Sequence, residues 1–135
     1  MKAKKKFGQN FLVDQNFISK IIKEINPKED CNILEIGPGR GAITNPILKK
    51  INHISVVEID PDMIKILKDK IDPKKISILA EDILNIDVGV FKKFNKIIGN
   101  LPYYIATEII LKITKIYNSP AELYFMVQKE VAERI

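Results

Sequence analysis

The feature that most constrains the fold of this chain is an alternation of short apolar, β-branched runs with longer amphipathic stretches. The run ISVVEI (54–59) is typical of a buried strand, whereas residues 16–25 carry apolar side chains at helical spacing and stop before Pro27. The same alternation repeats along the chain. Strands are expected at 32–37, 54–59, 76–80, 96–100 and 122–127, and helices at 16–25, 42–50, 61–71 and 107–116, with a last helix starting in 128–135.

Strands that alternate with helices in this way predict an α/β fold, a mostly parallel sheet with helices on both faces. In such sheets, ligands bind at the carboxyl ends of the strands, near the point where the strand order reverses. The residues directly after the strands are therefore the candidate site residues. They are polar, glycine-rich or aromatic at 37–41, 58–60, 81–82 and 100–104.

The turn after the first strand, EIGPGRG (35–41), has three glycines in five residues. Glycines let a ligand approach the backbone without a Cβ in the way, so Gly37 and Gly39 are predicted to contact a cofactor. Glu58 follows Gly37 by 21 residues, and there a carboxylate can accept hydrogen bonds from both hydroxyls of an adenosine ribose. This pattern fits NAD, through the fingerprint G-x-G-x-x-[GA], and S-adenosylmethionine equally.

Two acidic residues favour S-adenosylmethionine. Glu35 places a negative charge near the glycine turn, which suits the ammonium of a methionine moiety and does not suit a pyrophosphate. Asp82, after the third strand, can accept a hydrogen bond from an adenine amino group. The alternative role of Asp82, as a helix N-cap, does not exclude binding.

A methyl donor in this pocket also explains the stretch GNLPYYI (99–105), where the fourth strand is expected to end at Gly99 and Asn100. The exocyclic nitrogen of adenine is a poor nucleophile because its lone pair is delocalised into the ring. The amide oxygen of Asn100 and the backbone carbonyl of Leu101 can accept both amino hydrogens and favour a pyramidal nitrogen. Pro102 would fix the loop, and Tyr103 would offer a ring face to a flipped base. Catalysis would rest on positioning and electrostatics, without a metal or a general base before attack.

Length and composition fit one globular domain. The chain has 135 residues, 46% hydrophobic and 29% charged, without an apolar run of the roughly 18 residues that suggest a membrane span. The basic start MKAKKKFGQNF lacks the apolar segment of a signal peptide, so a cytoplasmic protein without a membrane partner is expected. Cys31 has no His or Cys at metal-ligand spacing, and His53 precedes an apolar strand; both are expected to be structural, and no metal is expected.

The net charge of +5 permits a polyanionic partner without requiring one. Lys2, Lys4, Lys5 and Lys6 cluster at the start of the chain. They form either a solvated tail or an arm that contacts phosphates, and both interpretations stay open.

The chain resembles the rRNA adenine N6-dimethyltransferases in successive motifs that cover essentially its whole length. These are KKFGQNFL (5–12), LEIGPGRGAIT (34–44), VVEID (56–60), AED (80–82), GNLPYYI (99–105) and LYFMVQKEVAERI (123–135). They are most similar to the KsgA (RsmA) type, which dimethylates two adjacent adenosines near the 3′ end of small-subunit (16S) rRNA. The resemblance implies a Rossmann-like class I S-adenosylmethionine-dependent methyltransferase fold, with small-subunit rRNA and the immature small ribosomal subunit as partners.

The resemblance also implies roles for individual residues. Asn10 and Leu12 are expected to line the methionine end of the cofactor site. The other roles agree with those argued above: Gly37 in the cofactor loop, Glu58 on the ribose, Asp82 on the adenine and Asn100 at the reacting amine.

Members of this family continue for about as many residues again, with further strands and a small helical RNA-binding domain. Residues 1–135 are therefore expected to be an incomplete S-adenosylmethionine-binding methyltransferase domain, truncated before the last two strands and without the C-terminal RNA-binding domain.

Other functions stay open at this point. The sister group that methylates large-subunit rRNA and confers macrolide resistance shares the fold, but more often has isoleucine where Leu101 stands. An NAD-linked oxidoreductase would use the same glycine loop and leave residues 100–104 unexplained. A non-catalytic RNA-binding or assembly factor could retain the fold without the activity.

Overall fold

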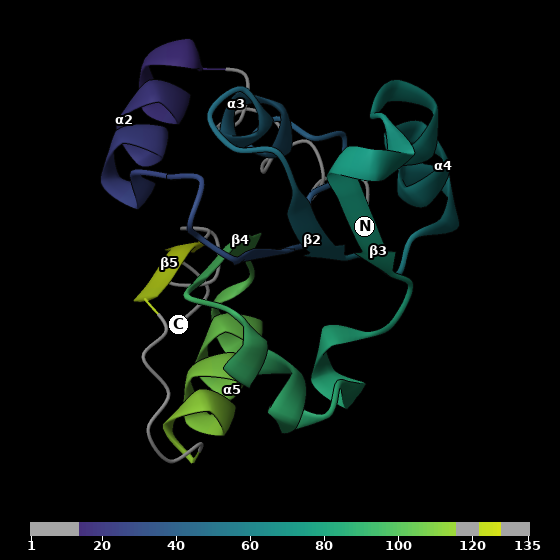
Figure 1. Ribbon diagram of the computed structural model, residues 1–135. Coiled ribbons are helices and arrows are strands. Elements are labelled where there is room, and N and C mark those ends of the chain that lie inside the picture. Colours follow the sequence, from purple (N-terminus) through teal and green to yellow (C-terminus); the bar gives the residue numbers. More distant parts are fainter. Residues whose placement is uncertain (1–13, 116–121, 128–135) are drawn as a thin grey trace.

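The computed structural model describes residues 14–115 and 122–127 (Figure 1). All the predicted strands are present, and they form one sheet in the order β3-β2-β1-β4-β5 in which every neighbouring pair is parallel. The predicted α/β fold with a parallel sheet is thereby confirmed. The strands are β1 Ile33–Ile36, β2 Ile54–Val57, β3 Ile76–Leu79, β4 Lys96–Leu101 and β5 Glu122–Val127.

Some of the predicted features lie outside the described residues. They are the lysine cluster at residues 2–6, the site residues Asn10 and Leu12, and the last helix within 128–135.

Among the described residues, the helices agree with the predicted ones in number and order, but α3 and α5 have boundaries that differ from the prediction. The helix α3 is shorter than expected because the turn that follows the glycines extends to Ile43. The helix α5 begins four residues early, at Tyr103, because Pro102 has a φ of −57° and leads directly into it. The helices are α2 Gln15–Ile25, α3 Thr44–Leu48, α4 Pro61–Lys70 and α5 Tyr103–Thr114, with short 3-10 turns η1 Pro73–Lys75, η2 Ile83–Asn85 and η3 Val88–Lys93.

The helices cover both faces of the sheet (Figure 1). One face carries α2, α3 and α4, and the other carries α5 with η2 and η3. Successive strand residues alternate between the two cores, since Ile98 packs with the first group of helices and Ile97 with the second. Both side chains are fully buried, which accounts for the apolar character of the strand sequences.

The strand order reverses between β1 and β4. The chain leaves β1 through α3 toward β2 on one face, and it leaves β4 through α5 toward β5 on the opposite face. In sheets of this kind, diverging crossovers open a crevice beyond the carboxyl ends of the two central strands. The tips of β1 and β4 are therefore where a ligand site is expected.

Candidate active site

The carboxyl ends of the central strands meet at one edge of the sheet. Ile36 of β1 lies opposite Val57 of β2 on one side and opposite Gly99 of β4 on the other. The residues that follow these three, Gly37, Glu58 and Asn100, therefore lie in a row across that edge. Pairing between strands brings together positions that are far apart in the sequence, as predicted.

The glycine loop follows β1. Gly37 and Gly39 have φ values of +65° and +56°, which residues with a side chain rarely adopt. The N–H of Gly37 donates to the carbonyl of Val57 at 2.8 Å, which ties the loop to β2. A Cβ added to Gly39 would meet no heavy atom within 4 Å, so the loop presents open backbone to its surroundings. The glycine loop therefore has room for a ligand that approaches its backbone, as S-adenosylmethionine would.

Glu58 lies at the tip of β2, and its side chain is held in place by backbone donors. One carboxylate oxygen accepts from the N–H of Gly39 at 3.2 Å. The other accepts from Ile59 at 3.1 Å and Asp60 at 3.0 Å. The residue is only 8% exposed. The carboxylate is thus pre-oriented beside the glycine loop, the position in which it could accept hydrogen bonds from a ribose.

Glu35 points into the interior of the protein. It is 4% exposed and accepts a hydrogen bond from the hydroxyl of Thr44 at the start of α3. Burial raises the pKa of Glu35 to about 7, the Thr44 hydrogen bond opposes that rise, and the nearby Glu58 adds to it. Burial thus favours the neutral form of Glu35, and its predicted pairing with the ammonium of a methionine moiety stays a prediction.

Asp82 has the N-cap role that was considered for it, and its role at adenine stays a prediction. Its Oδ1 atom accepts from the N–H of Leu84 at 3.0 Å and so caps η2, as the alternative interpretation predicted. No hydrogen bond engages its Oδ2 atom among the described residues. The cap therefore leaves one oxygen for an adenine amino group.

The stretch from Asn100 to Tyr103 is a junction between strand and helix rather than the loop that the sequence suggested. The strand β4 runs through Asn100 to Leu101, and Pro102 alone separates it from α5. Asn100 is partly exposed, and within the described residues no hydrogen bond holds its carboxamide. Tyr103 stands in the first turn of α5 and is 57% exposed. A rigid strand and helix, rather than a proline-braced loop, thus position these residues.

Two exposed side chains at this edge lie within the predicted candidate ranges 58–60 and 100–104, but the sequence assigned no individual role to either. Ile59, directly after Glu58, is 61% exposed, and Tyr104 is 57% exposed. The structure adds that the Ile59 side chain faces outward, although isoleucine is usually buried.

The remaining described residues offer no competing centre. His53 is engaged with Ser77, with 2.9 Å between Nε2 and Oγ, which fits the structural role expected for it. Across residues 14–115 and 122–127, no group of three or more His, Cys, Asp or Glu side chains could hold a metal ion. In the same part of the chain, no helix has the length and apolar character needed to cross a membrane.

Comparison with known proteins finds relatives that match nearly the whole chain. The curated ribosomal RNA small subunit methyltransferase A of Dechloromonas aromatica is 42% identical over 133 residues, 98% of this chain and 52% of that protein. A dimethyladenosine transferase from Plasmodium falciparum has a similar structure, with a TM-score of 0.70 and 27% identity over 90% of this chain and 44% of that one. The chain spans about half the length of the curated relatives it matches.

The fold is that of the class I S-adenosylmethionine-dependent methyltransferases. A coclaurine N-methyltransferase crystallised with N-methylheliamine and SAH superposes with a TM-score of 0.65, over 82% of this chain and 34% of that one, and its 12% identity makes this a likeness of fold alone. At the level of sequence, the model of the family described as "Ribosomal RNA adenine dimethylase" matches residues 1–135. The chain thus belongs to the ribosomal RNA adenine dimethylase family.

Proposed function

We propose that residues 1–135 form the S-adenosylmethionine-binding domain of a methyltransferase. Its targets would be the exocyclic N6 atoms of two adjacent adenosines near the 3′ end of small-subunit rRNA. The observation that carries the proposal is the row of Gly37, Glu58 and Asn100 at the switch point of the sheet. Membership of the family and the names of the curated relatives support it.

The cofactor half of the proposed site is built on β1 and β2. S-adenosylmethionine would supply an electrophilic methyl group on a sulfonium, which is a good leaving group. Gly37 and Gly39 would let the ligand lie close to the backbone, and Glu58 would accept hydrogen bonds from the ribose hydroxyls. Asn10 and Leu12 are proposed to complete the methionine end.

The adenine of the cofactor would lie beside the ribose, toward the tip of β3. The Oδ2 atom of Asp82 would accept from its amino group while Oδ1 keeps its bond to Leu84. The exposed side chain of Ile59 would cover a face of the ring. This arrangement would use an apolar surface that is otherwise costly to leave in water.

The target adenine would enter on the β4 side. The Asn100 amide oxygen and the Leu101 carbonyl would each accept one amino hydrogen, which weakens conjugation of the lone pair with the ring and aims it at the methyl group. Pro102 would hold the two acceptors in place, because it joins β4 directly to α5. The exposed ring of Tyr103 would stack on the flipped base.

The substrate is proposed to be rRNA in an immature small ribosomal subunit in the cytoplasm. The relatives' names support small-subunit rRNA as the target class. The choice of an assembling particle over naked RNA rests on the resemblance of the motifs.

Two measurements test the proposal. Calorimetric titration with S-adenosylmethionine and, separately, with NAD should give binding only to the former; a preference for NAD would contradict the cofactor assignment. Tritiated methyl incorporation is then compared on unmethylated small subunits and on large subunits. Incorporation should be confined to small-subunit rRNA. Incorporation into large-subunit rRNA alone would favour the activity of the sister group, which methylates large-subunit rRNA.

A further inference from the structure

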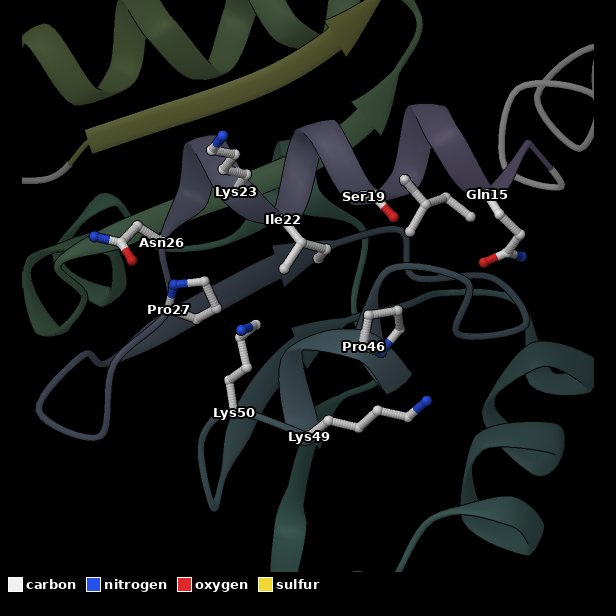
Figure 2. Close-up of a pocket in the computed structure, with 10 residues that line it drawn as sticks. Gln15, Ser19, Ile22, Lys23, Asn26, Pro27, Pro46, Lys49 and Lys50 are labelled. Atoms are coloured by element: carbon white, nitrogen blue, oxygen red, sulfur yellow. The ribbon is translucent and has the colours of Figure 1, made fainter.

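A groove separates α2 from α3 on the sheet face opposite α5 (Figure 2). Its volume is about 640 Å³. Ile18 and Ile22 of α2 and Pro46 of α3 give it an apolar floor. Pro46 lies half a turn beyond Thr44, where α3 begins next to the glycine loop. One end of the groove is therefore close to the candidate active site.

The polar part of the lining is positively charged. Lys23 lies in the last turn of α2, and Lys49 and Lys50 follow the end of α3. Figure 2 shows Lys49 and Lys50 on one side of the groove, with Ser19 and Asn26 on the other. Among the described lining residues no side chain carries a carboxylate. The groove thus concentrates positive charge without a built-in counter-ion.

The three groove lysines are exposed, and none has a hydrogen bond or ion pair within the described part of the chain. Other lysines in the same fold are engaged. Lys96 pairs with Glu122 at 2.8 Å, and Lys112 donates to the backbone carbonyl of Leu84. The groove lysines therefore have their full donor capacity available for an anion.

A purely structural reason for these lysines also exists. Positive side chains near helix C-termini interact favourably with the helix dipole, and all three lie at such ends. That role predicts a loss of stability when the charges are removed. A role in ligand binding predicts a loss of affinity for a polyanion instead, so the two can be separated.

We propose that the groove lined by Lys23, Lys49 and Lys50 binds the sugar-phosphate backbone of the RNA strand that carries the target adenosine. The proposal rests on the proposed function, since it takes the substrate to be RNA. Lysines would contact phosphates, the hydroxyl of Ser19 and the amide of Asn26 would bond to phosphate or sugar oxygens, and the apolar floor would accommodate sugar faces. Such contacts position a strand without reading its sequence.

The test replaces the three groove lysines together with glutamine: Lys23→Gln, Lys49→Gln and Lys50→Gln. The probe is a fluorescent single-stranded oligoribonucleotide of mixed sequence, and its affinity for the full chain is measured across a series of salt concentrations. The dependence of log affinity on log salt should flatten by up to about 2, since each phosphate contact to a single strand contributes about 0.7. This corresponds to binding that is weaker by up to about 100-fold at 0.1 M salt.

A matched control removes the same charge elsewhere, through Lys68→Gln, Lys70→Gln and Lys74→Gln at the end of α4 and in η1. This control should keep the wild-type salt dependence, and so should a variant with arginine at the three groove positions. If the control and the groove variant lost equal RNA affinity, the effect would come from the overall charge of the protein, and the proposal would be overturned.

Two further results would also overturn it: wild-type protein that does not bind the probe, or a groove variant that melts at a lower temperature with unchanged RNA affinity. Calorimetry with S-adenosylmethionine keeps the two proposals apart, because the groove variant should bind the cofactor as wild type does. Wild-type protein that bound RNA through the groove but not S-adenosylmethionine would contradict the proposed function and leave the groove assignment standing.

Discussion

The carboxylate of Glu58 accepts a hydrogen bond from the backbone N–H of Gly39 at 3.2 Å, and this bond joins the tip of β2 to the glycine loop. Two further backbone N–H groups, those of Ile59 and Asp60, occupy the other oxygen. A carboxylate has about four acceptor positions, so about one is left. A ribose that presents two hydroxyls would have to share or displace the Gly39 contact, which couples the loop to ribose binding.

Replacing Glu58 with alanine should weaken S-adenosylmethionine binding by about 1–3 kcal/mol, because the ribose hydroxyls and the Gly39 N–H would lose their acceptor. Isothermal titration calorimetry measures the effect directly. Asp69→Ala, at an exposed position of α4, is the matched control and should bind as wild type. Unchanged affinity in folded Glu58→Ala protein would remove Glu58 from the site.

Asn100→Ala should reduce the rate of methyl transfer by at least about 100-fold, the scale of losing one preorganised electrostatic contact. The affinity for S-adenosylmethionine should change far less, because the carboxamide acts on the target base. Single-turnover kinetics on unmethylated small subunits, with Asn85→Ala in η2 as a control, check this split. A rate within a few-fold of wild type would show that the carboxamide has no catalytic role.

The buried Glu35 should make stability depend on pH. Burial raises the pKa of Glu35 from 4.5 to about 7 in the folded protein, so between these values the folded state binds the proton more tightly than the unfolded state. Stability from this group is therefore highest below about pH 4.5 and falls as the pH rises through about 7, by up to about 3 kcal/mol. Urea unfolding at pH 5 and pH 8 should show this fall in wild type and not in Glu35→Gln. Parallel pH profiles for the two proteins would contradict the assigned pKa.

Two glycines at the same edge should respond differently to alanine. A Cβ on Gly99 would lie 3.1 Å from both the Ile36 carbonyl oxygen and the Leu101 Cγ atom, so Gly99→Ala should destabilise the fold by about 1–3 kcal/mol. A Cβ on Gly39 would meet open space, and there the strain of a φ of +56° should cost about 1–2 kcal/mol while the methyl group obstructs the ligand. Thermal unfolding together with cofactor titration separates the two effects. If Gly39→Ala protein bound S-adenosylmethionine with wild-type affinity, the glycine loop would not be the cofactor site.

Local patterns in the sequence predicted the strands, the number of helices among the described residues and the glycine loop. These features depend on apolar periodicity and on glycine content, and both can be recognised within a short segment of the sequence. The boundaries of α3 and α5 were less predictable. The early start of α5 at Tyr103 depends on Pro102 continuing straight from a strand that is extended by pairing with β5.

By itself, the sequence determined which residues follow each strand, and therefore that Gly37, Glu58 and Asn100 are candidates for one site. Only the tertiary structure decided that β1 lies between β2 and β4, which sets these residues in a row, because strand pairing depends on long-range crossovers. The burial of Glu35 beneath α3 and the lysine groove between α2 and α3 likewise arise only when helices pack on the sheet. Neither a raised pKa nor a cleft is a property of a short segment, since both are made by neighbours that are distant in the sequence.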